Sequence, residues 1–514
     1  MNQSASLILS DAAISALTGI ERGIEKEGLR FTPDGTIAQT PHPLVLGSTL
    51  THPYITTDYS EALLEFITPK SDSLEQSLSF LRQLHSFTLA NVEGEEVWPA
   101  SMPCKLEGES SIPIAEYGSS NVGQMKHIYR RGLEVRYGRI MQAIAGIHYN
   151  ISLPESFWLA YQAQLNDQRP LAEFRSDQYF HLIRNFHRHS WVLYYLFGAS
   201  PVVDSSFFDD RAPALDQYGE RTWGLPYATS LRMSDLGYTN SAQKDLHIGY
   251  DSLDDYIKTL SHAVHQPYAA YEALGVKDQH GDYQQLNANI LQIENEYYSE
   301  IRPKRVARSG ERPVQALQRG GVEYIEVRAL DINPYLDVGL DEQEARFIDA
   351  FVLYCLVSNS PQQCPNEWAE IAENRATIIK YGRQPDLSLG FCGATKSVSD
   401  WVADIVKGTM QCAEHLDAAY GGDDYKAATS AQLDKARDPA LTPSGKLMAE
   451  VEAGNEFFDI VNSLSSQHKA ELLKGEHNFD HLTESADTSL QEFSEREQQQ
   501  EIPFSEYLDA YNEL

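Results

Sequence analysis

The sequence lacks both glycine patterns by which common nucleotide-binding folds hold phosphate groups. No stretch reads G-x-x-x-x-G-K-[ST], and no two of the 32 glycines are separated by a single residue. The first absence excludes a P-loop, and the second excludes the glycine-rich turn of a dinucleotide-binding fold. Any phosphate that this chain binds must therefore be held by arginine side chains or by metal ions.

Cysteine is scarce and loosely spaced, and long apolar runs are missing. The 5 cysteines form no close pairs, which excludes a disulfide scaffold and a cysteine-based zinc site. No basic residue precedes Arg22, so the N-terminal segment lacks the basic region of a secretion signal. The most apolar run, residues 191–203, contains Gly198 and Pro201 and is too short to span a bilayer. We therefore expect a cytoplasmic protein.

Positive charge is also in short supply. The chain has 74 acidic and 41 basic residues, a net charge of −33, which disfavours general binding to nucleic acid or to an anionic membrane. A hydrophobic share of 42% is enough to form a globular core. We find no internal repeat and no clear linker, so we expect residues 1–514 to form one unit. Within it, we expect a sheet-based core over residues 19–360 and a mostly helical region over residues 361–514.

One stretch, residues 320–334, organises the rest of the chain. Read with the two-residue period of a strand, it places Tyr324, Glu326 and Arg328 on one face and apolar residues on the other. An unpaired charge buried in such a strand is costly, so the polar face must look into a site that contains opposite charges. The plainer alternative is a buried structural Glu–Arg pair, and for this strand alone it is favoured by roughly two to one.

Four other segments show the same alternation, with an apolar face for helices and isolated polar groups on the other face. These expected strands span residues 19–31, 62–69, 145–154 and 289–298. Antiparallel sheets ordinarily turn a freely variable polar face to water. Here, in contrast, single carboxylates and an imidazole stand inside apolar runs.

If these polar faces converge, the carboxylates need a counter-charge. Like charges about 5 Å apart repel by roughly 3 kcal/mol at an effective dielectric constant near 20. Several such pairs would threaten a fold that is only about 5–15 kcal/mol stable. Divalent cations remove this problem, and oxygen ligands with one imidazole suit Mg²⁺ or Mn²⁺ better than zinc. The groups concerned are Glu25, Glu27, Glu65, His148 and Glu326.

A basic segment follows directly after residues 289–298. Residues 302–319 contain six of the 41 basic residues of the chain and one acid, Glu311. A metal-binding carboxylate cluster beside such a segment suggests a nucleoside triphosphate. Each sign alone has a plainer explanation at about even odds: an exposed strand face, a core histidine, or a solvated loop. Their joint occurrence favours a site.

Seven short motifs occur in order between about residue 19 and about residue 360. They are GIEKEGLR at 23–30, TTDYSEALLEFITP at 56–69, GIHYN at 146–150, SDLGYTN at 234–240, QIENE at 292–296, RPKR at 302–305 and EYIEVR at 323–328. In combination they closely resemble the bacterial glutamate–cysteine ligases (γ-glutamylcysteine synthetases) of the proteobacterial type. The tail beyond residue 360 matches more loosely.

The resemblance implies a fold and a reaction. The fold is α+β: a glutamine-synthetase-like curved antiparallel sheet forms a funnel-shaped active site, with helices on its outer face and a helical C-terminal region. The reaction is the first step of glutathione biosynthesis, in which ATP, L-glutamate and L-cysteine give γ-glutamylcysteine, ADP and phosphate through γ-glutamyl phosphate. The implied partners are these small molecules and glutathione as a feedback inhibitor, without nucleic acid or membrane. The implied state is a monomer forming a single catalytic unit.

The resemblance also implies a metal shell and a catalytic pair. The magnesium ligands, which Mn²⁺ could also use, are Glu25, Glu27, Asp58, Glu65, His148 and Glu326. Arg328 is expected to contact the transferring phosphoryl group and the glutamate carboxylate, with Glu326 as its catalytic partner.

Two further groups of residues are implied by position. The expected nucleotide-binding residues are Arg130, Arg302, Lys304, Arg305 and Arg308. The expected substrate-binding residues, most of them around the cysteine pocket, are Tyr129, Asn150, Arg232, Tyr238 and Tyr298. Cys364 and Cys392 do not stand where the family would place a cysteine pair, so no redox behaviour is carried over.

Three other functions compete with this interpretation. The nearest is another carboxylate–amine ligase of the same superfamily with a different amine substrate. A metal-dependent phosphohydrolase would use the same carboxylates but need no amino acid, and a non-enzymatic metal-buffering protein would need no ATP. Analysis of the products formed from glutamate and cysteine separates all of them.

Overall fold

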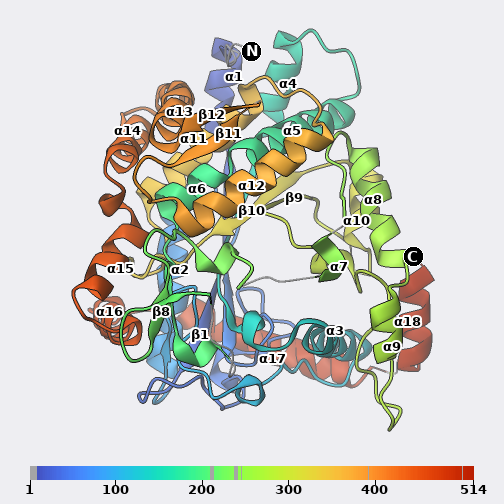
Figure 1. The fold of residues 1–514 in the computed structure, drawn as a ribbon. Coiled ribbons are helices and arrows are strands. Elements are labelled where there is room, and N and C mark those ends of the chain that lie inside the picture. Colours follow the sequence, from blue (N-terminus) through green and yellow to red (C-terminus); the bar gives the residue numbers. More distant parts are fainter. Residues whose placement is uncertain are drawn as a thin grey trace.

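The computed structural model describes residues 8–208, 214–236, 241–244, 246–308, 310–391, 393–499 and 502–513. Over these residues the protein is α+β, with helices packed around one large antiparallel sheet (Figure 1). This confirms the expected α+β class with an antiparallel sheet. No helix among the described residues is long and apolar enough to cross a membrane.

The large sheet has seven strands, and all of its strand pairs are antiparallel. In spatial order they are β2 (Ile55–Thr57), β3 (Leu63–Ile67), β1 (Glu21–Phe31), β5 (Ile147–Ser152), β10 (Tyr324–Leu330) and β9 (Ile301–Lys304), with β4 (Glu96–Val97) paired to the end of β1. Strands β1, β3, β5 and β10 are four of the five expected from alternation. The sequence order of these strands differs from their spatial order, so the sheet joins segments that are distant in the chain.

The apolar face of the sheet is covered by helices. Helices α2, α5 and α6 pack on the sheet, and α11 packs against α5, α13 and α14. Their bounds are α2 (Leu74–Asn91), α5 (Leu171–His189), α6 (Trp191–Phe197), α11 (Glu342–Val357), α13 (Val398–Tyr420) and α14 (Asp424–Arg437). Ser73 and Asp341 cap α2 and α11 by accepting amide hydrogen bonds in the first turn.

Buried polar contacts fix α11 against the back of the sheet. Arg22 of β1 forms an ion pair of 2.7 Å with Asp349 of α11, and both side chains are almost fully buried. Tyr149 of β5 donates a hydrogen bond of 2.9 Å to the same carboxylate. Removing one partner would leave a buried charge without compensation, so this contact holds the helix layer in one position.

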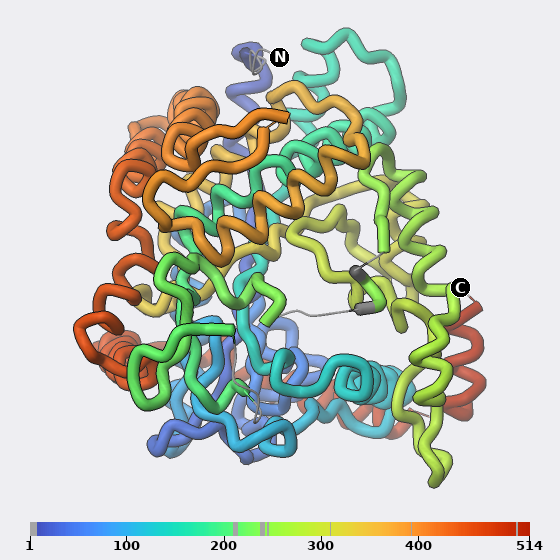
Figure 2. Tube along the Cα trace, in the orientation of Figure 1, coloured from blue at the N-terminus to red at the C-terminus, as the bar shows by residue number. Residues whose placement is uncertain are grey.

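The opposite, polar face of the sheet lies near α3 (Asn121–Tyr137). The C-terminal helix α18 (Phe504–Glu513) packs on α3, and α17 (Asp480–Glu497) ends beside its start, as the red and teal tubes in Figure 2 show. Glu497 accepts hydrogen bonds of 3.0 and 2.9 Å from the amides of Ser119 and Ser120, at the start of α3. A carboxylate at this position favours the helix.

The remaining elements surround this core. The helices are α1 (Asp11–Ser15), α4 (Glu155–Gln164), α7 (Ser241–Lys244), α8 (Leu253–His265), α9 (Ala269–Leu274), α10 (Pro313–Gly320), α12 (Pro365–Tyr381), α15 (Pro443–Glu452) and α16 (Phe457–Leu472). Two small antiparallel sheets are formed by β6 (Val202–Asp204), β8 (Thr222–Gly224) and β7 (Asp216–Gln217), and by β11 (Ser388–Phe391) and β12 (Ala394–Ser397).

The strand expected over residues 289–298 is wrong. Its only regular element is a single 3₁₀ turn, Glu294–Glu296. Two carboxylates of this segment form ion pairs with different arginines. Glu294 pairs with Arg312 at 3.0 Å, and Glu296 pairs with Arg136 at 2.9 Å. The alternation therefore reflects two buried ion pairs in an irregular segment. The basic segment that follows is β9 and α10 joined by a short connection.

Candidate active site

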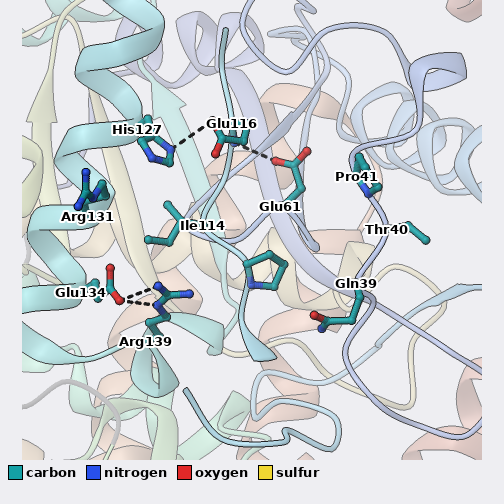
Figure 3. Close-up of a pocket in the computed structure, with 11 residues that line it drawn as sticks. Gln39, Thr40, Pro41, Glu61, Ile114, Glu116, His127, Arg131, Glu134 and Arg139 are labelled. Atoms are coloured by element: carbon teal, nitrogen blue, oxygen red, sulfur yellow. Dashed lines mark hydrogen bonds and ion pairs between the residues drawn. The ribbon is translucent and has the colours of Figure 1, made fainter. Parts of the chain in front are cut away.

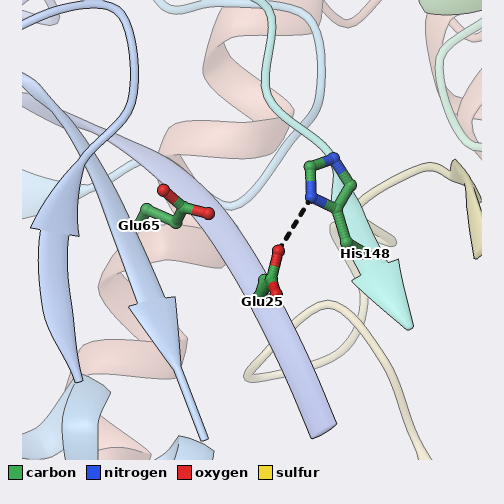
Figure 4. A group of neighbouring side chains, drawn as sticks. All are labelled: Glu25, Glu65 and His148. Atoms are coloured by element: carbon green, nitrogen blue, oxygen red, sulfur yellow. Dashed lines mark hydrogen bonds and ion pairs between the residues drawn. The ribbon is translucent and has the colours of Figure 1, made fainter. Parts of the chain in front are cut away.

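The strand register brings the predicted metal ligands together on one face of the sheet. Glu25 lies opposite His148 across the β1–β5 pair, and Glu27 lies opposite Glu65 across the β1–β3 pair. Glu25, Glu65 and His148 each offer one ligand atom within 4.8 Å of the others (Figure 4). Alternation along each strand and antiparallel pairing between strands are sufficient to produce this convergence.

His148 stands among three carboxylates. Its Nδ1 atom is 3.2 Å from Oε2 of Glu25 and 3.7 Å from Oε1 of Glu326, and its Nε2 atom is 3.9 Å from Oε1 of Glu27. Asn150 donates a hydrogen bond of 3.0 Å to the other oxygen of Glu25. The imidazole is thus oriented by the same carboxylates with which it could share a cation.

The electrostatic balance differs between the two ends of this face. At the β1–β3 end, burial raises the pKa of Glu65 well above its usual value, and Glu25 and Asp58 raise it further. Burial and Asp58 likewise raise the pKa of Glu27. The carboxylates at this end are short of positive charge, and Asp58, which follows β2, belongs to the same group.

At the β10 end, basic residues balance the carboxylate. Burial alone would raise the pKa of Glu326, but Lys304 and Arg328 hold it well below its usual range. Nη1 of Arg328 is 3.1 Å from Oε1 of Glu326 and 3.4 Å from Nδ1 of His148. Nζ of Lys304 is 3.4 Å from Oε2 of Glu326. Both bases therefore lie at the site.

The donor set fits a hard divalent cation. Carboxylate oxygens and one imidazole are the ligands present, and no cysteine belongs to the cluster among the described residues. Oδ1 of Asn150 is buried without a hydrogen-bond partner in the described part of the chain, so this oxygen is available to a ligand beside Glu25.

Arg232 supports the strand that carries Arg328. Its Nη2 atom donates a hydrogen bond of 3.1 Å to the backbone carbonyl of Arg328, and Nη1 is 3.6 Å from Asp331. The guanidinium lies against Gly146, where a Cβ atom would stand 2.1 Å from Nη2. Only glycine leaves room for this close approach.

Most of the other predicted phosphate-binding arginines bind backbone carbonyls. Arg302 donates a bond of 2.9 Å to Asn295 and a second bond to Tyr297. Arg305 donates bonds of 2.6 and 2.5 Å to Gly321 and Gly320.

Arg130 of α3 and Arg308 differ in burial and in their hydrogen bonds. Arg130 is almost fully buried and donates hydrogen bonds to the carbonyls of Asp58 and Lys126. It therefore ties α3 to the segment that bears the Asp58 carboxylate. Arg308 is exposed, and its amide bonds to Glu311.

Three predicted substrate-pocket tyrosines have different surroundings. Tyr298 donates a hydrogen bond of 2.9 Å to Sδ of Met233. Tyr129, on α3, packs against an apolar cluster that includes Leu508 of the C-terminal helix, and burial raises its pKa. Tyr238 lies outside the described residues.

Lys126 and Arg375 are two charged residues near the site that the sequence reasoning missed. Lys126 of α3 has its pKa lowered to about 8 by burial and by Arg130, and it interacts electrostatically with Glu65 and Asp58. Its spacing of four residues from Arg130 on one helix face could have revealed it. Arg375 comes from α12, beyond the motifs, and no sequence signal marks it.

A cavity of about 610 Å³ lies elsewhere, and no predicted site residue lines it. Figure 3 shows His127, Arg131 and Glu134 of α3 on one wall, and Glu61 and Pro41 on another. Glu61 is already engaged, because it accepts amide hydrogen bonds from His42 and Glu116. Because none of the predicted site residues lines the cavity, it is separate from the carboxylate cluster.

Comparisons with known proteins identify the family of this chain. The family model described as glutamate-cysteine ligase matches residues 6–378. A glutamate–cysteine ligase of Alcanivorax borkumensis is 48% identical over 513 residues, which is 98% of each chain. One of Hahella chejuensis is 52% identical over 463 residues, which is 89% of this chain and 88% of the relative. The crystal structure of a glutamate–cysteine ligase from Francisella tularensis in complex with AMP superimposes with a TM-score of 0.90 at 35% identity and covers 96% of this chain and 97% of that one. The chain belongs to the glutamate–cysteine ligase family.

Proposed function

We propose that the polar face of the large sheet is the site at which this ligase joins its substrates. As a member of the family, the protein ligates the γ-carboxylate of L-glutamate to the amine of L-cysteine in an ATP-dependent reaction, the first step of glutathione biosynthesis. The observation that carries the proposal is the convergence of Glu25, Glu65 and His148 next to Glu326 and Arg328.

Mg²⁺, or Mn²⁺ in its place, is the cation that this face would hold. The residues that would bind it are Glu25, Glu27, Asp58, Glu65, His148 and Glu326. When bound, the cation would neutralise the triphosphate and the charge that develops during phosphoryl transfer. The shortage of positive charge at Glu27 and Glu65 supports this placement.

The protein side chains then have to position the reacting groups. A γ-carboxylate oxygen of glutamate attacks the γ-phosphorus of ATP, the bond to ADP breaks, and γ-glutamyl phosphate forms. Arg328 is oriented for this step by Glu326 at 3.1 Å and would hold the transferring phosphoryl group with its planar fork. Lys304 balances the remaining charge of Glu326.

The second step forms the peptide bond. The amine of cysteine, having lost a proton, attacks the acyl carbon, and the carbon–oxygen bond to phosphate breaks as phosphate leaves. Water competes with the amine, so the pocket must enclose the acyl phosphate. Tyr129, Asn150, Arg232, Tyr238 and Tyr298 are proposed to shape the amino acid pockets.

We propose a separate function, in nucleotide binding, for four other arginines: Arg130, Arg302, Arg305 and Arg308. Arg302, Arg305 and Arg130 tie down the segments that frame the site through backbone carbonyls, so their effect on the nucleotide is proposed as indirect. Arg308 is exposed and is the one of the four left to reach a phosphate directly.

The remaining features extend the proposal. We propose that the curved sheet forms the wall of a glutamine-synthetase-like funnel, and that residues 1–514 act as one catalytic unit. Contacts of α12 and α18 with the core support this unity. We further propose a monomer, located in the cytoplasm where ATP is made, and inhibited by glutathione as the product of the pathway.

Product analysis tests this function. The purified chain is incubated with ATP and Mg²⁺, with and without each amino acid, and ADP and γ-glutamylcysteine are quantified by mass spectrometry. ADP release should require glutamate and cysteine together. Vigorous ATP hydrolysis without amino acids would favour the phosphohydrolase, and a γ-glutamyl product with another amine in place of cysteine would favour a different ligase.

A further inference from the structure

Arg375 brings a positive charge from the C-terminal helical region to the start of β9, the strand that pairs with the one carrying Arg328. It lies on α12, and its Nη1 atom is 3.2 Å from Oε1 of Glu300. Glu300 directly precedes β9, and its backbone carbonyl accepts a hydrogen bond of 2.8 Å from the amide of Arg328. One residue, Glu300, therefore contacts both arginines.

In the ion pair of Glu300 and Arg375, the glutamate is buried and the arginine is partly exposed. Glu300 is 2% exposed and accepts hydrogen bonds of 2.8 Å from Ser190 and 2.5 Å from Tyr194. Nδ1 of His187 is 3.7 Å away. The side chain of Arg375, in contrast, keeps 39% of its surface exposed. The buried carboxylate of Glu300 thus holds the guanidinium of Arg375 in place, and a ligand can still approach Arg375.

Tyr298 is linked to Arg375 through Glu300, the residue that binds Arg375. Tyr298 precedes Glu300 by two residues and reaches Met233 with its hydroxyl. The hydroxyl of Tyr298 acts electrostatically on both Arg328 and Arg375. Electrostatic interactions thus link Tyr298 both to the arginine proposed for the phosphoryl group and to a second arginine without an assigned function.

We propose that Arg375 binds the α-carboxylate of the amine substrate, L-cysteine. This inference rests on the proposed function, in which Tyr298 shapes the cysteine pocket. A guanidinium presents several N–H donors in a planar fork, so one edge can hold Glu300 while another donates hydrogen bonds to a substrate carboxylate. A substrate carboxylate that leaves water needs such a partner. The geometry assigns Arg375 to substrate selection, although it lies beyond the seven motifs.

A purely structural function is the alternative to be excluded. In that case the ion pair between Arg375 and Glu300 would only hold α12 against the core. Its removal would then lower the stability of the protein and impair every substrate alike. Substrate binding, in contrast, predicts a loss that depends on the carboxylate of the amine substrate.

The test measures kcat/KM of the full chain for two amines, L-cysteine and cysteamine, which lacks the carboxylate. The variants are R375Q, R375K and the control R188Q. Arg188 forms a comparable ion pair of 2.6 Å with Glu367 at the other end of α12. R375Q should lower kcat/KM for L-cysteine by roughly 10- to 100-fold, the range of a charge-assisted hydrogen bond. With cysteamine the effect of R375Q should be within about twofold, because the group that Arg375 recognises is absent.

Three further readouts complete the test. R375K should restore part of the loss with L-cysteine, and the KM values for glutamate and ATP should stay within about twofold of the wild-type values. R188Q should leave the KM for cysteine unchanged, even if its melting temperature falls. An equal loss with both amines, or a rise in the KM for glutamate alone, would overturn the inference and leave the proposed function intact. A wild-type protein that makes no γ-glutamylcysteine would overturn both.

Discussion

Glu27 of β1 stands directly opposite Glu65 of β3, so two like charges share one face of the sheet. Burial raises the pKa of both carboxyl groups, and Asp58 raises each further. At the other end of the same face, Lys304 and Arg328 outweigh burial and lower the pKa of Glu326. At the β9–β10 end, basic residues therefore balance the carboxylate. The β1–β3 end lacks positive charge, and a divalent cation would balance its carboxylates.

Removing one of the opposed carboxylates should separate metal binding from stability. In Glu65→Gln, the metal-free protein should be at least as stable as the wild type, because a buried like-charge repulsion is gone. Mg²⁺ should raise the melting temperature of the wild type but not that of the variant, and activity should fall at least ~10²-fold. Thermal unfolding with and without Mg²⁺ and steady-state kinetics check these outcomes.

Glu21→Gln is the matched control for this experiment. Glu21 begins the same strand, but its carboxylate is exposed and pairs with Lys70 at 3.0 Å. This variant should keep the Mg²⁺-dependent rise in melting temperature. If Glu65→Gln also kept that rise and near-normal turnover at limiting Mg²⁺, Glu65 would not be a metal ligand.

Arg328 should be sensitive to shape as well as to charge. Arg328→Lys keeps one positive charge but loses the planar fork, so kcat should fall roughly 10²-fold while the fold is preserved. Circular dichroism verifies the fold, and Arg169→Lys, at an arginine paired with Asp167 on the surface, is the control. If Arg328→Lys kept the kcat of the wild type, a positive charge at this position would be sufficient for catalysis and the planar fork would not be needed.

The pH dependence of stability should reveal the anchor of Arg375. Burial alone would raise the pKa of Glu300, but Arg375 and His187 lower it from 4.5 to about 2. A carboxyl group with a lowered folded-state pKa stabilises the protein above its unfolded pKa, and this contribution is lost as the pH falls from 4.5 towards 2. Glu300→Gln should therefore cost roughly 3 kcal/mol at pH 7.

Chemical denaturation of the wild type and Glu300→Gln at several pH values checks this prediction. The difference in unfolding free energy between the two proteins should shrink between pH 7 and pH 3. A difference that stayed constant over this range would mean that the ionised carboxylate contributes nothing specific.

Four strands of the large sheet could be predicted because their function imposes a pattern. A strand whose two faces meet an apolar helix layer and a charged site must alternate, and β1, β3, β5 and β10 do. Residues 289–298 alternate for another reason, since Glu294 and Glu296 each find a distant arginine. One sequence does not reveal those partners, so the two cases look the same.

Strand β9 and the second arginine site could not be predicted for different reasons. Pro303 argues against a strand, but β9 pairs only with β10, and an edge strand tolerates proline. The basic residues there are expected to bind phosphates, whereas Arg302 and Arg305 bind backbone carbonyls that folding brings near. Glu300 and Arg375 are 75 residues apart, and only the tertiary structure joins them.

Isotope transfer should distinguish an acyl phosphate from direct attack by the amine. If the γ-carboxylate attacks ATP, one of its oxygens leaves with phosphate when cysteine displaces it. Glutamate labelled with ¹⁸O in the γ-carboxylate should therefore give phosphate that carries one labelled oxygen, as measured by mass spectrometry. Unlabelled phosphate together with normal γ-glutamylcysteine formation would contradict the acyl phosphate and leave the substrates unchanged.

Anomalous diffraction from crystals that contain Mn²⁺ tests most directly whether the opposed carboxylates form the metal site. Data collected near the manganese absorption edge should show a peak at coordination distance from oxygens of Glu25 and Glu65 and from a ring nitrogen of His148. The peak should be lost in Glu65→Gln. A catalytically active, Mn²⁺-loaded protein with its manganese bound elsewhere, and none at these three residues, would contradict the account.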